Sequence, residues 1–149
     1  MSLHIISHKN FKIDKPLSKK LSTAFDLICI EERLSNCSVN LKILNDSEIK
    51  NLNRKFRNKN KPTNVLSFTN EDISKQVTNN LGDIAISYEY VELESKEQNK
   101  KFDNHFIHMF IHGIYHILGF DHESDSMADV MEDKEILLLK KLNIKDPYK

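Results

Sequence analysis

Glycine, proline, cysteine and long apolar runs are all scarce in this sequence. Only three glycines and three prolines occur in 149 residues, which argues against long structureless segments. No stretch approaches the roughly 20 consecutive apolar residues that are needed to cross a bilayer, and residues 1–10 have no long apolar region behind a basic start. We therefore expect a single domain over residues 1–149, without a linker or membrane association, that remains in the cytoplasm.

The two cysteines do not form a recognisable motif. Cys29 and Cys37 lie eight residues apart and lack C-x-x-C spacing. Cys29 lies in the apolar run Leu27–Ile30, which indicates a buried thiol, and no role is expected for Cys37. Neither a disulfide nor a cysteine metal site is predicted.

Charge is balanced overall but unevenly distributed. The 22 basic and 22 acidic residues give a net charge of zero, whereas residues 50–61 carry six basic and no acidic residues, and residues 121–135 carry seven acidic residues and one lysine. The first segment is suited to phosphates and the second would repel them. The alternative for residues 50–61 is a solvated helix face, and proximity to a metal site would decide between the two.

Three histidines occur within the sequence HGIYHILGFDH at residues 112–122. His112 and His116 are four residues apart, so a helix would place them on one face in adjacent turns. His108 lies two turns from His116, about 12 Å along the helix axis, whereas zinc–nitrogen bonds are only about 2 Å long. His108 and His116 therefore cannot bind the same ion.

Gly119 offers a way to supply a third ligand. Glycine readily adopts the left-handed conformation that ends helices, so the chain can turn there and bring His122 toward the pair. Three imidazoles around zinc leave a fourth position for water, whose pKa falls from about 15.7 to about 7. The alternative, polar residues on a partly buried helix, is less favoured for three histidines at this spacing.

The same spacing is found in metzincin proteases, whose H-E-x-x-H motif has a glutamate directly after the first histidine as the general base. Here Gly113 occupies that position. Glu123, Asp121 or Asp83 could replace the missing base, but nothing in the sequence distinguishes them. A metalloprotease is therefore kept as an alternative function.

The histidine motif, together with KPTNVLSF at residues 61–68 and LGDIAIS at residues 81–87, resembles the YbeY family of bacterial rRNA-maturation endoribonucleases. The resemblance implies that His112, His116 and His122 bind one zinc ion per chain, and that Arg57 matches the arginine thought to act in catalysis. It also implies 16S rRNA 3′-end processing and ribosome quality control. The expected partners are the 16S rRNA precursor and the small ribosomal subunit.

The basic segment favours single-stranded over duplex RNA, because the exposed backbone of a single RNA strand can enter a cleft beside this segment without any base pairs being broken. Imidazole ligands also suit divalent metals other than zinc.

A noncatalytic ribosome-binding protein is a further alternative, in which His108 or Asp121 would complete a closed four-ligand site. Asp121 is otherwise expected to accept an imidazole N–H or to form a turn. We expect a monomer or weak dimer.

Apolar periodicity predicts the secondary structure. Strands are expected at residues 3–7, 38–44, 65–68 and 81–87, and helices at 17–34, 47–56, after 87, 99–118 and 127–142. The side chains expected to face inward from two of these helices are Ile49, Leu52, Phe56, Val130, Leu137, Leu138 and Leu142. The polar segment 70–80 is predicted to be a mobile loop.

These elements predict an α+β fold, in which helices cover a small mixed sheet of about four strands. The three-histidine site would lie at the end of the long helix.

Overall fold

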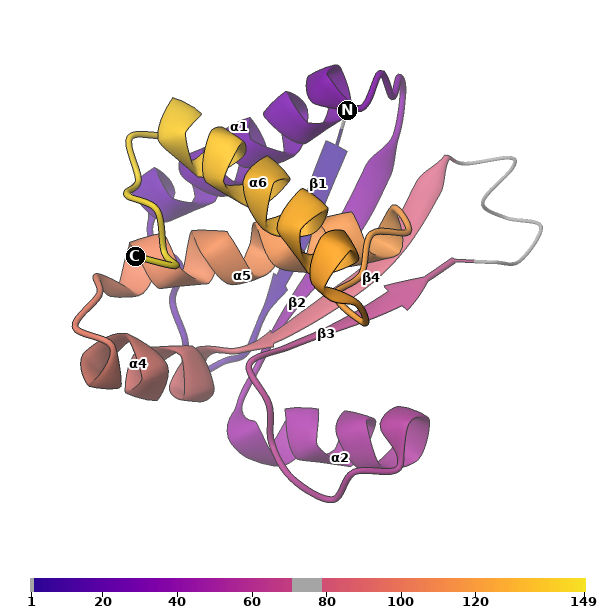
Figure 1. Ribbon diagram of the computed structural model, residues 1–149. Coiled ribbons are helices and arrows are strands. Elements are labelled where there is room, and N and C mark those ends of the chain that lie inside the picture. The colour runs from indigo at the N-terminus through magenta and orange to yellow at the C-terminus, as the bar shows by residue number, and fades with distance from the viewer. Residues whose placement is uncertain (1, 71–78) are drawn as a thin grey trace.

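The computed structural model describes residues 2–70 and 79–149, which form a four-stranded mixed sheet and five α-helices (Figure 1). The strands are β1 (Ser2–Ser7), β2 (Ser38–Leu44), β3 (Val65–Thr69) and β4 (Asn80–Ser87), and the helices are α1 (Lys15–Glu31), α2 (Asp46–Arg57), α4 (Tyr88–Glu97), α5 (Phe102–Ile117) and α6 (Asp125–Lys141). The predicted α+β class and mixed sheet are confirmed. Most of the loop predicted at residues 70–80 lies outside the described residues.

The sheet has the strand order β1-β2-β4-β3. Strands β1, β2 and β4 run parallel to one another, whereas β3 runs antiparallel to β4 and forms an edge. Helix α5 packs against β3 and β4, and α2 covers part of the opposite face of the sheet (Figure 1). The edge strand β3 therefore lies between the C-terminal end of α2 and the helix that carries the histidines.

The ends of α2 follow from local sequence. Asn45 caps the helix by accepting a hydrogen bond from the backbone N–H of Glu48, whose side chain accepts one from the backbone N–H of Asn45. This reciprocal pair satisfies two backbone donors that have no partner within the helix. At the other end Asn58 adopts a left-handed conformation with φ of 61°. The helix therefore ends immediately after Arg57.

The main core lies between the sheet and helices α1, α5 and α6. Strand β2 contributes Val39, Leu41 and Ile43, which alternate with half-buried residues as predicted. Helix α5 is buried along most of its length, which removes its backbone and apolar side chains from water. A smaller cluster of Ile49, Leu66 and Ala85 lies under α2. Helix α5 is therefore held firmly on the sheet.

Several inward-facing assignments were wrong. Phe56 is 50% exposed because it lies at the end of α2, where its ring packs against Phe68. Val130 and Leu137 are also largely exposed. Leu138 is buried as predicted, and the other buried residues of α6 are Met131, Glu135 and Leu139. The spacing of these four residues, which is four, three and one positions, defines one helix face, and that face includes a charged residue.

Both cysteines are buried and unpaired, and their sulfur atoms lie 3.0 Å apart. The predicted burial of Cys29 is confirmed, whereas Cys37 contributes to the core more than expected. Among the described residues, no helix has the length and apolar character required to cross a membrane.

Candidate metal centre and adjoining cleft

Three imidazoles converge at the C-terminal end of α5. His112, His116 and His122 each offer a nitrogen, and these three atoms lie within 4.8 Å of one another. The Nε2 atoms of His112 and His116 are 3.1 Å apart. Two nitrogens that are each about 2 Å from a tetrahedral zinc ion would be separated by about 3.3 Å. The donor set and its spacing therefore fit a metal ion.

The turn that follows α5 brings His122 to the other two histidines. Gly119 has a φ of +99°, and its N–H donates to the carbonyl oxygen of His116, while the N–H of Phe120 donates to that of Tyr115. This is the Schellman pattern of helix termination, and the packing of Phe120 against Tyr115 provides the usual apolar contact. The turn predicted at Gly119 is confirmed.

The protonation of His116 suits metal binding. Burial, with smaller effects from His112 and His122, lowers the pKa of His116 from its ordinary value of 6.5. The side chain is therefore neutral at pH 7, and a neutral imidazole is the form that binds a metal ion.

Glu135 of α6 lies directly behind His112. Its side chain is fully buried, and Oε2 accepts a hydrogen bond of 3.1 Å from Nδ1 of His112. Oε1 accepts bonds from Nε2 of His108 at 2.6 Å and from the hydroxyl of Tyr148 at 2.8 Å. Burial raises the pKa of the carboxyl group, but the bonds from His108 and His112 outweigh this effect and lower it to about 2. Glu135 is therefore ionised at neutral pH and acts only as an acceptor.

Neither residue considered as a fourth ligand joins the cluster. Nε2 of His108 is engaged by Glu135, and Oδ1 of Asp121 accepts the backbone N–H of Glu123. Asp121 thus has the turn-forming role that was one of its two predicted roles. Across residues 2–70 and 79–149, the only potential metal-binding cluster is that of the three histidines. Within these described ranges, no fourth protein ligand joins the three imidazoles.

A cleft of about 600 Å³ adjoins the three histidines. Its lining also includes Arg57, Lys59 and Lys61 from the end of α2 and the loop that follows. Half of the basic segment at residues 50–61 therefore lies beside the candidate metal centre, which favours a role in binding phosphate over the alternative of a solvated helix face.

Arg57 is oriented by contacts with β3. Its Nη2 donates a hydrogen bond of 2.8 Å to the carbonyl oxygen of Ser67, and the guanidinium lies 5.1 Å from the ring centre of Phe68. The hydroxyl of Ser67 donates a bond of 2.9 Å to the carbonyl oxygen of Gly113. Ser67 thus joins Arg57 to the helix that carries His112.

Gly113 faces the sheet and not the cleft. A Cβ atom at this position would lie 3.1 Å from Oγ of Ser67, 3.2 Å from Ile84 and 3.3 Å from Val65. A glutamate at position 113 would therefore be directed into β3 and β4. The chain therefore lacks the general base of H-E-x-x-H proteases, and packing against the sheet leaves no room for a glutamate at position 113.

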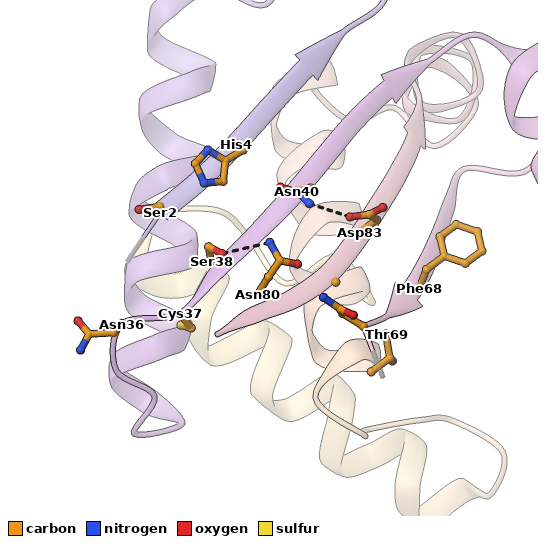
Figure 2. A pocket seen from close by; sticks show the side chains of 12 residues that line it. Ser2, His4, Asn36, Cys37, Ser38, Asn40, Phe68, Thr69, Asn80 and Asp83 are labelled. Atoms are coloured by element: carbon orange, nitrogen blue, oxygen red, sulfur yellow. Dashed lines mark hydrogen bonds between the residues drawn. The ribbon is translucent and has the colours of Figure 1, made fainter. Parts of the chain in front are cut away.

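A larger hollow of about 940 Å³ lies on the open face of the sheet. Figure 2 shows its polar walls, in which Asn40 donates to Asp83 and Asn80 donates to Ser38. Among its described lining residues, His4 is the single imidazole and Asp83 the single carboxylate. The smaller cleft is the better candidate for the functional site, because the converging imidazoles and the basic residues occur together there.

The sequence predictions missed Glu135, Tyr148 and Ser67. One signal for Glu135 was present, since it shares a helix face with the apolar residues Met131, Leu138 and Leu139. A carboxylate on such a face needs buried partners. Nothing in the local sequence indicated that those partners would be histidines of α5.

Comparisons with known proteins agree with this description. The family model Endoribonuclease YbeY matches residues 4–143. Proteins named Endoribonuclease YbeY from Francisella tularensis subsp. novicida (strain U112) and from Francisella tularensis subsp. tularensis (strain SCHU S4 / Schu 4) are each 43% identical over 137 residues. These alignments cover 89% of this chain and 85% and 82% of theirs. The solution structure of TM1509 from Thermotoga maritima has a TM-score of 0.62 and 26% identity, with 95% of this chain and 91% of that chain covered.

Proposed function

The chain belongs to the YbeY family of endoribonucleases, and from this membership we propose that it cleaves single-stranded RNA during maturation of the 3′ end of 16S rRNA and in ribosome quality control. The observation that carries the proposal is the convergence of three imidazoles beside a cleft lined by Arg57, Lys59 and Lys61. The imidazoles suit a metal ion, and the basic side chains suit a polyanion.

His112, His116 and His122 are the proposed ligands of one zinc ion per chain. When bound, the ion would supply a Lewis acid that lowers the pKa of water or polarises a phosphoryl oxygen. The three neutral donors and the remaining coordination position fit a catalytic site better than a closed structural one. Because imidazole also binds other divalent metals, metal content must be measured directly.

Arg57 is the proposed catalytic residue from the protein. Its guanidinium has five N–H donors in a planar fork, which matches the geometry of phosphate oxygens. The bonds to Ser67 and Phe56 use only part of this capacity. Arg57 would therefore stabilise negative charge on the scissile phosphate while its bond to β3 maintains its orientation.

Lys59 and Lys61 extend the positive wall along the loop after α2. They are proposed to hold the flanking phosphates of a single strand, which can enter the cleft without unpairing. The proposed setting is the cytoplasm, with the 16S rRNA precursor and the small ribosomal subunit as partners. A monomer or weak dimer is proposed, since each chain contains all the residues of the candidate site.

The test is cleavage of an end-labelled single-stranded RNA that carries the 3′ region of 16S rRNA, with its duplex form as a comparison. Wild-type protein loaded with zinc should cut the single strand, and His116→Ala at equal concentration should not. Equal cutting by both proteins would show that the cleavage does not depend on the three-histidine cluster and would refute the proposal. Hydrolysis of an unfolded protein substrate with the RNA left intact would support the metalloprotease alternative instead.

A further inference from the structure

The imidazole of His112 has two nitrogens, and the structure gives them different partners. Nε2 lies 3.1 Å from Nε2 of His116, on the side where the three histidines converge. Nδ1 lies 3.1 Å from Oε2 of Glu135 on the opposite side. Because a carboxylate can only accept, it fixes the proton on Nδ1 and leaves the Nε2 lone pair directed at the cluster.

We propose that Glu135 is a positioning residue for the metal, which holds His112 in the orientation and tautomer required for coordination, and that His108 and Tyr148 hold Glu135 in turn. This inference rests on the metal site of the proposed function. It adds helix α6 and the segment that carries Tyr148 to that site, although neither supplies a ligand. Figure 1 shows α6 crossing over α5, the arrangement that brings Glu135 to His112.

The arrangement around Glu135 is restrictive. The carboxylate has no exposed surface, and its two oxygens accept three hydrogen bonds, two from histidines of α5 and one from Tyr148 near the C-terminus. His108 is itself buried, and its ring lies 5.4 Å from that of Tyr148 and nearly perpendicular to it. Rotation of Glu135 away from His112 would break bonds that no water could replace in this buried position. The orientation of His112 is therefore set by packing as well as by one hydrogen bond.

The chain also contains a matched control. His105, on the same helix α5, is buried, and its Nε2 lies 3.0 Å from Oε1 of Glu94. Glu94 also accepts a bond from Asn64, but it has no hydrogen bond to any of the three clustered histidines. The variants Glu135→Gln and Glu94→Gln therefore both alter a histidine–carboxylate pair, and only the first alters one that includes a proposed ligand.

The experiment measures the dissociation constant of zinc by competition with a chromogenic chelator, together with the visible absorption spectrum of the Co²⁺-loaded protein. Glu135→Gln should weaken zinc binding about 10-fold to 100-fold and change the Co²⁺ spectrum, because the amide cannot satisfy all three donors. Glu94→Gln should bind zinc within about twofold of wild type and keep the spectrum. A wild-type zinc affinity in Glu135→Gln, or an equal loss in both variants, would overturn the proposal.

Tyr148→Phe removes one donor to Glu135 and provides the decisive measurement if Glu135→Gln does not fold. It should weaken zinc binding by about twofold to fivefold, which is less than the full worth of one hydrogen bond because the hydroxyl acts on His112 only through Glu135. An unchanged affinity would then overturn the proposal. These readouts do not involve RNA, so a protein that responds as expected but fails to cleave RNA would refute only the nuclease function. A wild-type protein with no zinc affinity would refute the metal site itself.

Discussion

Nη2 of Arg57 donates a hydrogen bond of 2.8 Å to the carbonyl oxygen of Ser67, although the two residues lie on different elements, α2 and β3. The hydroxyl of Ser67 in turn donates to the carbonyl oxygen of Gly113, which directly follows His112 in α5. The guanidinium and the clustered imidazoles are therefore held in the same cleft through the edge strand. Such a rigid connection allows charge stabilisation without reorganisation during the reaction.

Replacement of Arg57 by alanine should lower the rate of RNA cleavage by about 100-fold or more, because one donor to developing negative charge is lost. Zinc affinity should not change, since Arg57 contacts no proposed ligand. Arg57→Lys should be intermediate, because it keeps the charge but not the planar fork. Arg54→Ala is the control, as Arg54 lies one turn earlier on α2 and outside the cleft lining. A wild-type cleavage rate in zinc-loaded Arg57→Ala would disprove the catalytic role.

Gly119→Ala should weaken zinc binding and lower the free energy of unfolding by about 1–2 kcal/mol. The cause is conformational only, since φ is +99° and no heavy atom lies within 4 Å of the added Cβ. Gly119→Asn should lose less zinc affinity and less stability than Gly119→Ala, because asparagine tolerates a left-handed backbone better than alanine does. Urea unfolding and zinc titration of the two variants check this. Equal losses in both would show that the turn does not control the position of His122.

Gly113→Glu would create the H-E-x-x-H motif, but we expect it not to produce a protease. The new side chain would meet Ser67, Ile84 and Val65 and bring a charge against the sheet, which should cost about 3 kcal/mol or more in stability. Thermal unfolding and a protein-hydrolysis assay measure the two effects. A stable variant that hydrolyses protein would show that position 113 faces the metal after all.

Zinc should raise the melting temperature of the metal-free protein, because only the folded chain brings the three histidines together. At a free zinc concentration 100 times the dissociation constant, the gain in stability is about 2.7 kcal/mol. His116→Ala should abolish this gain, whereas His4→Ala should keep it, since His4 is exposed on β1 and distant from the cluster in sequence. A zinc-dependent shift that persists in His116→Ala would place the metal elsewhere.

Stability should also depend on the protonation of His105. Burial lowers the pKa of His105 below 6.5, and the bond to Glu94 offsets this only in part. Below pH 6.5 the unfolded chain therefore binds more protons than the folded protein. The contribution of neutral His105 to the free energy of unfolding is complete above pH 6.5 and is lost as the pH falls toward the pKa of His105 in the folded protein.

The measurement compares wild type with His105→Gln by urea unfolding in the presence of a chelator. The difference in free energy of unfolding should be smaller at about pH 5.5 than at about pH 7.5. A difference that grows at the lower pH would mean that His105 is charged in the folded protein.

Features that depend on neighbours in sequence were predictable. The four-residue spacing of His112 and His116 and the glycine at position 119 specify a helix face and a turn by local geometry alone. The alternation in β2 follows in the same way from backbone periodicity. The resemblance to a known family added the role expected of Arg57, which geometry alone did not indicate.

The sequence by itself thus determined the α+β class, the three-histidine cluster and the turn that completes it, because each depends on residues within a few positions of one another. Only the tertiary structure decided that β3 lies at the sheet edge and brings Arg57 to the histidines, and that α6 places Glu135 behind His112. Both relationships join residues more than 20 positions apart. The physical reason is that strand order and helix crossing depend on how all the buried faces pack together, which cannot be predicted from any local sequence pattern.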